Sequence, residues 1–246
     1  MVPQAGETGC WHAAGMVETK TRWGALSDWP PSAVQEIYLL RHGQTLANAD
    51  GIIQGWVDYP LTELGLQQAR DTAEALSTLE CRHIFTSPIG RAARTAVILA
   101  EAMPDAVVAV LPGMTEIHAG AVTGRTWDEF AQIYPESYRD FRQRLVSGPG
   151  AIAKEGLPGW EPFEHVVYRT WHAIGAVLAC VTAPIVMVVS HGDTINCLLT
   201  QALHGSALTG DWPYRQPNCA VSRLVLTPQG PRLPDGVRVL HHREVT

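Results

Sequence analysis

Two histidines occupy the same kind of position in this sequence, and they are the first candidates for chemistry. The apolar run 37–40 leads into Arg41-His42-Gly43, and the apolar run 185–189 leads into Ser190-His191-Gly192. Short apolar runs of this kind are typical of buried strands. Because ligands in open α/β sheets bind at the carboxyl ends of strands, the sequence predicts that the two imidazoles meet at one sheet edge.

A third junction between a predicted strand and a predicted helix adds a cation to this edge. The run His83–Thr86 is followed by Ser87-Pro88 and then by Arg91, which falls in the first turn of the helix. A surface salt bridge would explain one such arginine. Together with Arg41, however, it favours a binding site for a dianion, because guanidinium groups bind phosphate oxygens through paired N–H groups. Each such charge-assisted hydrogen bond contributes about 1.5–3 kcal/mol.

Composition and charge narrow the classes of function. The chain has 246 residues, is 46% hydrophobic and carries a formal net charge of −6. An acidic chain does not favour nucleic-acid binding, which needs a basic surface. We expect no membrane segment, because the longest apolar stretch, 177–189, is broken by Thr182 and Pro184. Five scattered cysteines and the absence of a visible secretory signal favour a cytoplasmic protein.

Predicted strands and helices alternate along most of the chain. The strands are expected at 37–40, 83–86, 106–111, 185–189, 221–226 and 237–240. The helices are expected at 62–79, 88–103, 126–145, 163–181 and 193–203, with Thr62 as an N-cap. This order predicts an α/β fold, a three-layer α/β/α sandwich with a mainly parallel sheet.

The domain organisation is expected to be simple. Residues 34–246 are predicted as one domain, and the glycine-rich stretch after 112 predicts a small cap insertion at about 117–160. Residues 1–33 form an N-terminal extension without clear periodicity. Its three tryptophans are unusual for a disordered tail, so we expect it to dock on the body or on a partner subunit, which leaves a homodimer open. An inert extension is the alternative.

The ordered set of motifs resembles the histidine phosphatase superfamily, the phosphoglycerate-mutase-like group, over about residues 35–227. The matching residues are Leu40–Thr45, Asn48, Gln54-Gly55, Leu61–Gly65, Gln68-Ala69, Ser87-Pro88, Arg91-Ala92, Thr95-Ala96, Glu116 with Gly120 and Gly124, Val189–Gly192, and Asn218 before Val221.

The resemblance implies a role for each catalytic position. His42 attacks phosphorus and becomes a phosphohistidine, for which its attacking nitrogen must be neutral. Arg41, Arg91 and His191 hold the phosphoryl oxygens. Glu116 protonates the leaving oxygen and then activates water.

The same resemblance implies further contacts around the phosphate. Gln44 and Asn48 orient the substrate or phosphate, Gln54-Gly55 shapes the pocket rim, and Thr194 offers its backbone N–H to phosphate. No metal and no other cofactor is expected, because the arginines supply the positive charge.

Three departures from the family pattern concern the surroundings of the site. Asp193 stands where a second glycine is common, Ala121-Val122-Thr123 replaces a segment that often holds an aromatic residue, and Gly159–Pro162 replaces a Gly-Glu-Ser type sequence. Asp193 lies one position too late to match the aspartate donor of distant members, so Glu116 is preferred as the acid. We interpret these changes as alterations of the substrate pocket, to which His118 is also a candidate contributor.

The sequence therefore predicts a metal-independent phosphatase acting on a small phosphorylated metabolite. A cofactor-dependent phosphoglycerate mutase is the first alternative, and it is disfavoured because the stretch from Glu116 to His191 is compact. A non-catalytic module on the same fold is the second alternative, against which the presence of all five catalytic positions argues.

Overall fold

The central sheet of the computed structural model has seven strands in the part of the chain that is described, residues 29–139, 141, 157–205 and 214–241. The strand order is β3-β2-β4-β1-β5-β6, and β7 also pairs with β5. The strands are β1 (Glu36–Arg41), β2 (His83–Thr86), β3 (Val107–Val110), β4 (Ile185–Ser190), β5 (Ala220–Thr227), β6 (Gly230–Arg232) and β7 (Val237–Val239).

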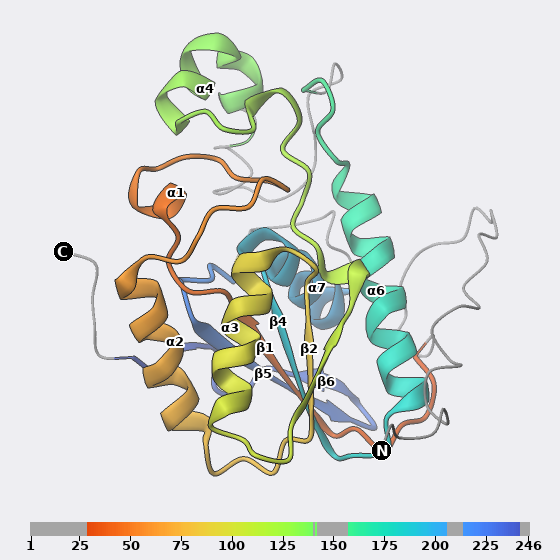
Figure 1. The fold of residues 1–246 in the computed structure, drawn as a ribbon. Helices are drawn as coiled ribbons and strands as arrows, with labels where there is room; N and C mark the ends of the chain where they lie inside the picture. Colours follow the sequence, from red (N-terminus) through yellow and green to blue (C-terminus); the bar gives the residue numbers. More distant parts are fainter. Residues whose placement is uncertain (1–28, 140, 142–156, 206–213, 242–246) are drawn as a thin grey trace, which may run out of the picture.

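Helices cover both faces of this sheet (Figure 1), so the predicted three-layer sandwich is confirmed. One face carries α2 (Glu63–Leu76) and α3 (Gly90–Glu101), and the other carries α6 (Phe163–Cys180) and α7 (Gly192–His204). Side chains alternate across a strand, so Tyr38 and Leu40 of β1 enter the first core while Ile37 and Leu39 enter the second. Burial on both faces explains why β1 reads as a continuous apolar run.

The sheet is mixed, with its parallel part carrying the sequence motifs. Strands β3, β2, β4 and β1 are parallel, whereas β5 pairs antiparallel with β1, β6 and β7. The antiparallel edge could not be anticipated from hydrophobic runs alone, and the short strand β6 was not predicted. Residues Thr227 to Gly230 join β5 to β6, and the backbone of Gly230 has a φ of 118°, which favours glycine.

Between β3 and α6 the chain leaves the sheet. This excursion contains the short helices η3 (Pro112–Met114), η4 (Gly120–Val122) and α4 (Trp127–Ile133), and α4 lies apart from the sheet at the top of Figure 1, as the four-residue helix α1 (Leu46–Ala49) also does. A small core of its own contains Ile53, Ala119, Val122, Phe130 and Leu157. The cap boundaries of about 117–160 stay a prediction, since 142–156 lie outside the described residues.

The expectation of one continuous helix from Thr126 to Leu145 is wrong. Helix α4 ends at Ile133, Tyr134 leaves the helical region with φ −130° and ψ 63°, and a second helical stretch covers 135–139. The cause is Pro135, which lacks an N–H and disfavours the helical conformation in the residue before it. Leu145 itself lies outside the described residues.

One tryptophan of the predicted N-terminal extension packs on the body. The ring of Trp29 stacks on Trp171 of α6 with centroids 4.1 Å apart, and its indole N–H donates to the Trp171 carbonyl at 3.3 Å. The expected docking is therefore confirmed for Trp29, whereas Trp11 and Trp23 lie outside the described residues.

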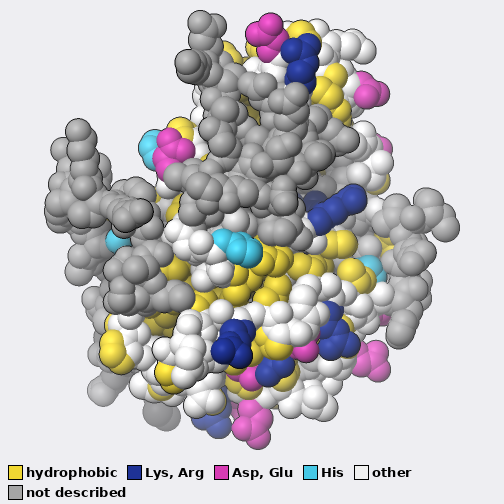
Figure 2. All heavy atoms as spheres, turned by 180° about the vertical axis from the view of Figure 1, so that it is seen from behind, with side chains coloured by type: hydrophobic (Ala, Val, Ile, Leu, Met, Phe, Trp, Pro, Cys, Tyr) yellow, Lys and Arg dark blue, Asp and Glu magenta, His cyan; other side chains and the backbone are white. Residues whose placement is uncertain are grey.

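The surface seen from behind mixes charges of both signs with hydrophobic side chains (Figure 2). On the described part of this face, Lys and Arg side chains are scattered among Asp and Glu rather than gathered into one basic area. Among the helices that the structure describes, none combines the length and the hydrophobicity that a membrane crossing requires.

Candidate active site

The two motif histidines follow neighbouring strands of the sheet. Arg41 of β1 pairs in register with Ser190 of β4, and the His42 amide donates to the Ser190 carbonyl at 3.0 Å. The ring centroids of His42 and His191 are consequently 5.3 Å apart, in an edge-on arrangement of 62°. The approach of the two imidazoles, expected from the repeated motif, is therefore confirmed. We call Arg41, His42, Arg91 and His191 the cationic cup.

The proton on His42 can be placed from its partners. Nδ1 lies 2.7 Å from the Gly43 carbonyl, which can only accept, so Nδ1 carries the proton. Nε2 accepts from Arg91 Nε at 3.2 Å and therefore presents its lone pair toward the cup. Burial, followed by the charges of Arg41 and Arg91, holds the pKa of His42 well below its ordinary value. The imidazole is neutral at pH 7, as a nucleophile requires.

Two nitrogens in the cup are buried and have no hydrogen-bond partner among the residues that the structure describes. They are Arg41 Nε and His191 Nδ1. Arg41 otherwise donates from Nη1 to the Gln216 carbonyl at 2.6 Å, and His191 Nε2 lies 2.7 Å from the Ser87 hydroxyl. A buried polar group without a partner costs about 1–3 kcal/mol, so an oxyanion that binds both nitrogens would recover this energy.

His191 is neutral for the same reason as His42. Its pKa lies well below the ordinary value because of burial first and the charge of Arg91 second. The formal positive charge of the cup therefore comes from its two guanidinium groups, and the imidazoles contribute polar nitrogens.

The guanidinium of Arg91 is aimed by the loop after α1. Its Nη1 donates to the Val57 carbonyl and its Nη2 to the Gly55 carbonyl, each at 2.8 Å, while its backbone N–H donates to Asp58 Oδ1 at 3.1 Å. Gly55 has a φ of 50°, and a Cβ there would lie 2.9 Å from the Ala119 amide nitrogen. The predicted rim residue Gly55 thus contributes a carbonyl that orients Arg91 and allows the excursion to approach.

Gly43 permits close packing rather than an unusual backbone conformation, since neither Gly43 nor Gly192 has a positive φ. A Cβ on Gly43 would collide with the Gly65 carbonyl oxygen, and a Cβ on Gly65 would collide with the Gln44 carbonyl oxygen. These glycines let the first turn of α2 pack directly against the backbone of the His42 motif. Thr62 caps this helix as predicted, accepting from the Gly65 amide at 2.9 Å.

The carboxylate of Glu116 lies at the N-terminal end of α7. Its Oε1 accepts from the Thr194 amide at 3.2 Å, from the Thr194 hydroxyl at 2.9 Å and from the Ile117 amide at 2.9 Å. When it is ionised, this carboxyl raises the pKa of Arg41 and of Arg91 against the lowering effect of burial. The predicted acid therefore lies within electrostatic reach of the cup.

Thr194 was expected to offer its backbone N–H to phosphate, and this contact stays a prediction. In the structure the N–H is donated to Glu116 Oε1 at 3.2 Å, and the N-cap of α7 is His191. The first turn of the helix offers a free N–H to whichever anion is nearest, and here that anion is a protein carboxylate.

Two predicted glutamines brace the loops around the site. Gln44 Oε1 accepts from the Thr62 hydroxyl, and Gln54 Oε1 accepts from the Thr45 hydroxyl, each at 2.9 Å. Both glutamine side chains are buried. The predicted contact of Gln44 with substrate stays a prediction, and the contacts that the structure shows hold the loops on either side of α1.

The turn before β5 contacts the backbone of the predicted nucleophile, His42. Asn48 Oδ1 accepts from Asn218 Nδ2 at 3.1 Å, and the same Nδ2 lies 3.2 Å from the His42 carbonyl. The Cys219 amide also donates to that carbonyl at 3.2 Å, and Cys219 adopts an unusual φ of 54° for a residue other than glycine. Asn48 is thereby linked to His42 through a residue far along the chain.

Several residues near the site were not assigned a role from the sequence. Ser87 contacts His191, and the indole N–H of Trp56 donates to the Glu116 carbonyl at 2.6 Å. Trp56 also packs edge-on against His118, with ring centroids 5.0 Å apart. Their signals were present but weak, because Ser87 directly precedes Pro88 and Trp56 directly follows Gly55 in the matching motifs.

Asp193 is partly buried in the first turn of α7. Burial and the neighbouring charge of Glu116 raise the pKa of this carboxyl to about 7. It is a second titratable acid beside Glu116 at the position where the family pattern has glycine.

Comparisons with known proteins agree with this geometry. Residues 37–235 match the model of the histidine phosphatase superfamily (branch 1). The probable phosphoglycerate mutase GpmB of Cronobacter sakazakii is 34% identical over 190 residues, which cover 77% of this chain and 84% of that relative.

Two solved structures have the same fold, and the second is named as a phosphatase. Bacillus stearothermophilus YhfR has a TM-score of 0.73 at 27% identity, covering 84% of this chain and 99% of that one. Mycobacterial glucosyl-3-phosphoglycerate phosphatase, in a structure with VO3, has a TM-score of 0.69 at 27% identity, covering 82% and 98%. Since the match covers most of the sheet, both histidine motifs and the segment that carries Glu116, this chain belongs to the histidine phosphatase superfamily, branch 1.

Proposed function

We propose that this chain is a phosphatase that hydrolyses a small-molecule phosphomonoester through a phosphohistidine on His42, without a metal ion. The observation that carries the proposal is the state of His42. It is a buried, neutral imidazole whose Nε2 lone pair faces Arg91 and lies beside His191. A neutral nitrogen fixed at its other end by a backbone carbonyl is prepared for attack on phosphorus.

The first step forms the phosphoenzyme. His42 Nε2 attacks phosphorus as the bond to the ester oxygen breaks, and the leaving oxygen takes a proton from Glu116. Arg91 Nε, which donates to Nε2 in this structure, transfers its hydrogen bond to a phosphoryl oxygen. Arg41 Nε and His191 Nδ1 bind the other oxygens, and each well-placed donor of this kind contributes about 10²–10³ to the rate.

The second step releases phosphate. Glu116, now a carboxylate, takes a proton from a water molecule, whose oxygen attacks phosphorus as the bond to His42 Nε2 breaks. The hydrogen bond from Nδ1 to the Gly43 carbonyl keeps the proton on Nδ1 throughout, so His42 returns to its starting state.

A phosphoglycerate mutase is the second candidate, favoured by the 34% identity to probable GpmB enzymes. It would use the same phosphohistidine but return the phosphoryl group to a hydroxyl of the substrate. The two are separated by incubating the protein with 3-phosphoglycerate and with simple phosphate esters. A phosphatase releases inorganic phosphate, whereas a mutase produces the isomeric phosphoglycerate.

The proposal is tested most directly by His42→Ala. We expect turnover of a phosphate ester to fall by about 10⁴-fold or more, with the fold retained by circular dichroism. Rapid quenching into alkali should trap a phosphoenzyme in the wild type only. Acidic conditions are avoided, because phosphohistidine is acid-labile. The matched control is His165→Ala on the exposed surface of α6, which should keep wild-type activity. Substantial phosphatase activity in His42→Ala would refute the mechanism.

A further inference from the structure

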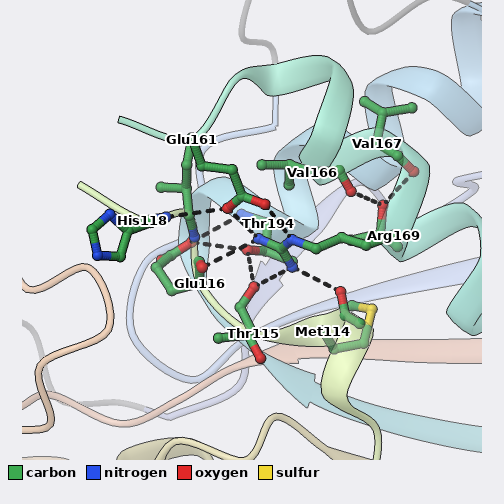
Figure 3. Close-up of polar contacts among 12 residues, drawn as sticks. Met114, Thr115, Glu116, His118, Glu161, Val166, Val167, Arg169 and Thr194 are labelled. Atoms are coloured by element: carbon green, nitrogen blue, oxygen red, sulfur yellow. Dashed lines mark hydrogen bonds and ion pairs between the residues drawn. The ribbon is translucent and has the colours of Figure 1, made fainter. Parts of the chain in front are cut away.

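Arg169 of α6 uses every N–H group of its guanidinium in the structure (Figure 3). Nε donates to Glu161 Oε1 at 2.7 Å, and Nη2 donates to Glu161 Oε2 at 2.9 Å and to the Glu116 carbonyl at 3.2 Å. Nη1 donates to the Gly113 carbonyl at 2.8 Å and to the Thr115 carbonyl at 2.5 Å. Arginine has five N–H groups on its guanidinium, and each of them has an acceptor here.

Glu161 neutralises Arg169 and also contacts the backbone beyond Glu116. The two side chains are largely buried, at 19% exposure for Arg169 and 14% for Glu161. Glu161 Oε2 accepts from the His118 amide at 3.2 Å, and the Glu161 amide donates to the His118 carbonyl at 2.9 Å. The Gly159–Pro162 departure was interpreted as a change in the substrate pocket, which stays a prediction, and in the structure its Glu161 binds Arg169.

We call the stretch from Gly113 to His118 the acid segment. Side chains from elsewhere in the chain donate hydrogen bonds to four successive carbonyls of this segment. Besides the three that Arg169 binds, the Met114 carbonyl accepts from the Ser190 hydroxyl at 2.6 Å. Beyond η3 this segment belongs to no helix or named strand. The backbone around Glu116 is therefore held by hydrogen bonds from side chains of α6 and β4, and not by the backbone hydrogen bonds of a strand.

We propose that the Arg169–Glu161 ion pair is the device that positions Glu116 for proton transfer. This inference rests on the proposed function, in which Glu116 is the acid and base. The pair holds the backbone on both sides of Glu116, and Thr194 holds its carboxylate. Neither member of the pair touches the cationic cup in the described structure, so both are positioning residues rather than catalytic ones.

The geometry requires arginine rather than any cation. A lysine ammonium has three donors on a flexible stem and cannot span the carboxylate and three carbonyls that Arg169 binds in fixed directions. Replacement by lysine keeps the charge opposite Glu161 while it releases part of the acid segment. A displacement of about 1 Å at a catalytic group can cost about 10²-fold in rate.

The test compares two substrates that differ in their need for an acid. An alkyl phosphate needs its leaving oxygen protonated, whereas p-nitrophenyl phosphate has a good leaving group. The parameter is kcat/KM, because it reports the step that forms the phosphoenzyme. We expect Arg169→Lys to lower kcat/KM for the alkyl ester by about 10–100-fold and for the nitrophenyl ester by less than about threefold.

A double-variant cycle separates this inference from the proposed function. Glu116→Gln alone should show the same selective loss, and Glu116→Gln combined with Arg169→Lys should lose no more than Glu116→Gln alone. An equal loss on both esters in Arg169→Lys, or additive losses in the double variant, would overturn the positioning role while the proposed function stands. A non-selective Glu116→Gln would instead show that the proposed acid is wrong.

A matched control and a second variant guard against a general loss of structure. Arg223 makes a comparable pair of ionic contacts, with Glu36 at 2.8 Å and Asp235 at 3.0 Å, and Glu36 is at the start of β1. Arg223→Lys should leave kcat/KM unchanged on both esters. If Arg169→Lys does not fold, Glu161→Gln is measured in its place and should show the same ester selectivity. Failure of both variants to fold would show that the pair serves the whole fold and would overturn the proposal.

Discussion

The cationic cup and the acid segment supply the two halves of the proposed reaction, but they are held by different means. His42 and His191 follow adjacent parallel strands, and their backbones are fixed by the register of β1 against β4. Glu116 belongs to no named strand. Arg169 and Trp56 bind its carbonyl, and Ser190 binds the carbonyl of Met114 in the same segment. The two histidines of the cup are thus positioned by the sheet, whereas the acid segment is positioned by individual side chains.

This difference predicts how each half responds to substitution. Residues that surround the cup can change without moving it, provided that the sheet forms, so its sensitive positions are the reacting groups and the glycines that allow close packing. The acid segment should respond to changes at residues that never contact a substrate.

Replacement of Arg91 by lysine should cause the largest loss at a cup residue other than His42. A lysine cannot contact His42 Nε2, the Val57 carbonyl and the Gly55 carbonyl together, so the remaining charge would be poorly aimed. We expect kcat/KM to fall by about 10²–10³-fold on alkyl and nitrophenyl esters alike. The control is Arg94→Lys, an exposed position on the same helix. A loss confined to the alkyl ester would contradict the assignment of Arg91 to phosphate binding.

The close packing of α2 on the His42 motif is probed by Gly65→Ala. The new methyl group would collide with the backbone oxygen of Gln44, which cannot rotate away as a side chain could. We expect the free energy of unfolding, measured by denaturant titration, to fall by about 2–4 kcal/mol. Gly175→Ala is the matched control, because its nearest neighbour would be the Trp29 ring at 3.6 Å. That variant should be unchanged or up to about 1 kcal/mol more stable.

The buried histidines of the cup should make stability depend on pH. Their pKa values are depressed in the folded state, so below about pH 6.5 the unfolded chain binds protons that the folded chain does not. Stability is therefore full above pH 6.5 and is lost as the pH falls through that value. The raised pKa of Asp193, about 7, acts in the opposite direction, so the variant comparison is the informative one.

His191→Asn should reduce the fall in unfolding free energy between pH 7 and pH 5, by at most about 1.4 kcal/mol per pH unit. The measurement is denaturant titration at several pH values. His165→Asn, at an exposed position of α6, should keep the wild-type dependence. An unchanged slope in His191→Asn would mean that this imidazole is not held neutral in the folded protein.

The sequence predicted the parallel half of the molecule well, because each site residue there follows an apolar run that forms a buried strand. The prediction that Arg41, His42 and His191 lie together required only that β1 and β4 be neighbours. The antiparallel edge and the helix break at Pro135 were harder to predict from the sequence. The first depends on which strands pair, and the second on a local steric effect that a helical hydrophobic pattern masks.

The support of Glu116 could not be predicted from the sequence for a different reason. Arg169 lies within a strongly helical pattern and looks like a solvated position on α6, and Glu161 lies in a stretch with no regular pattern. Their contacts with the acid segment involve backbone carbonyls, which every residue possesses. Residue types alone therefore carry no information about where such a guanidinium binds, and only the tertiary structure shows it.

The hydrogen bonds that the turn before β5 makes to the His42 carbonyl have a consequence for the order of assembly. Asn218 and Cys219 lie more than 170 positions after the histidine whose carbonyl they bind. A growing chain on the ribosome would contain both histidine motifs and Glu116 well before these donors emerge. The backbone around the proposed nucleophile is thus completed only after helix α7 has been made, which ties the finished site to the formation of β5.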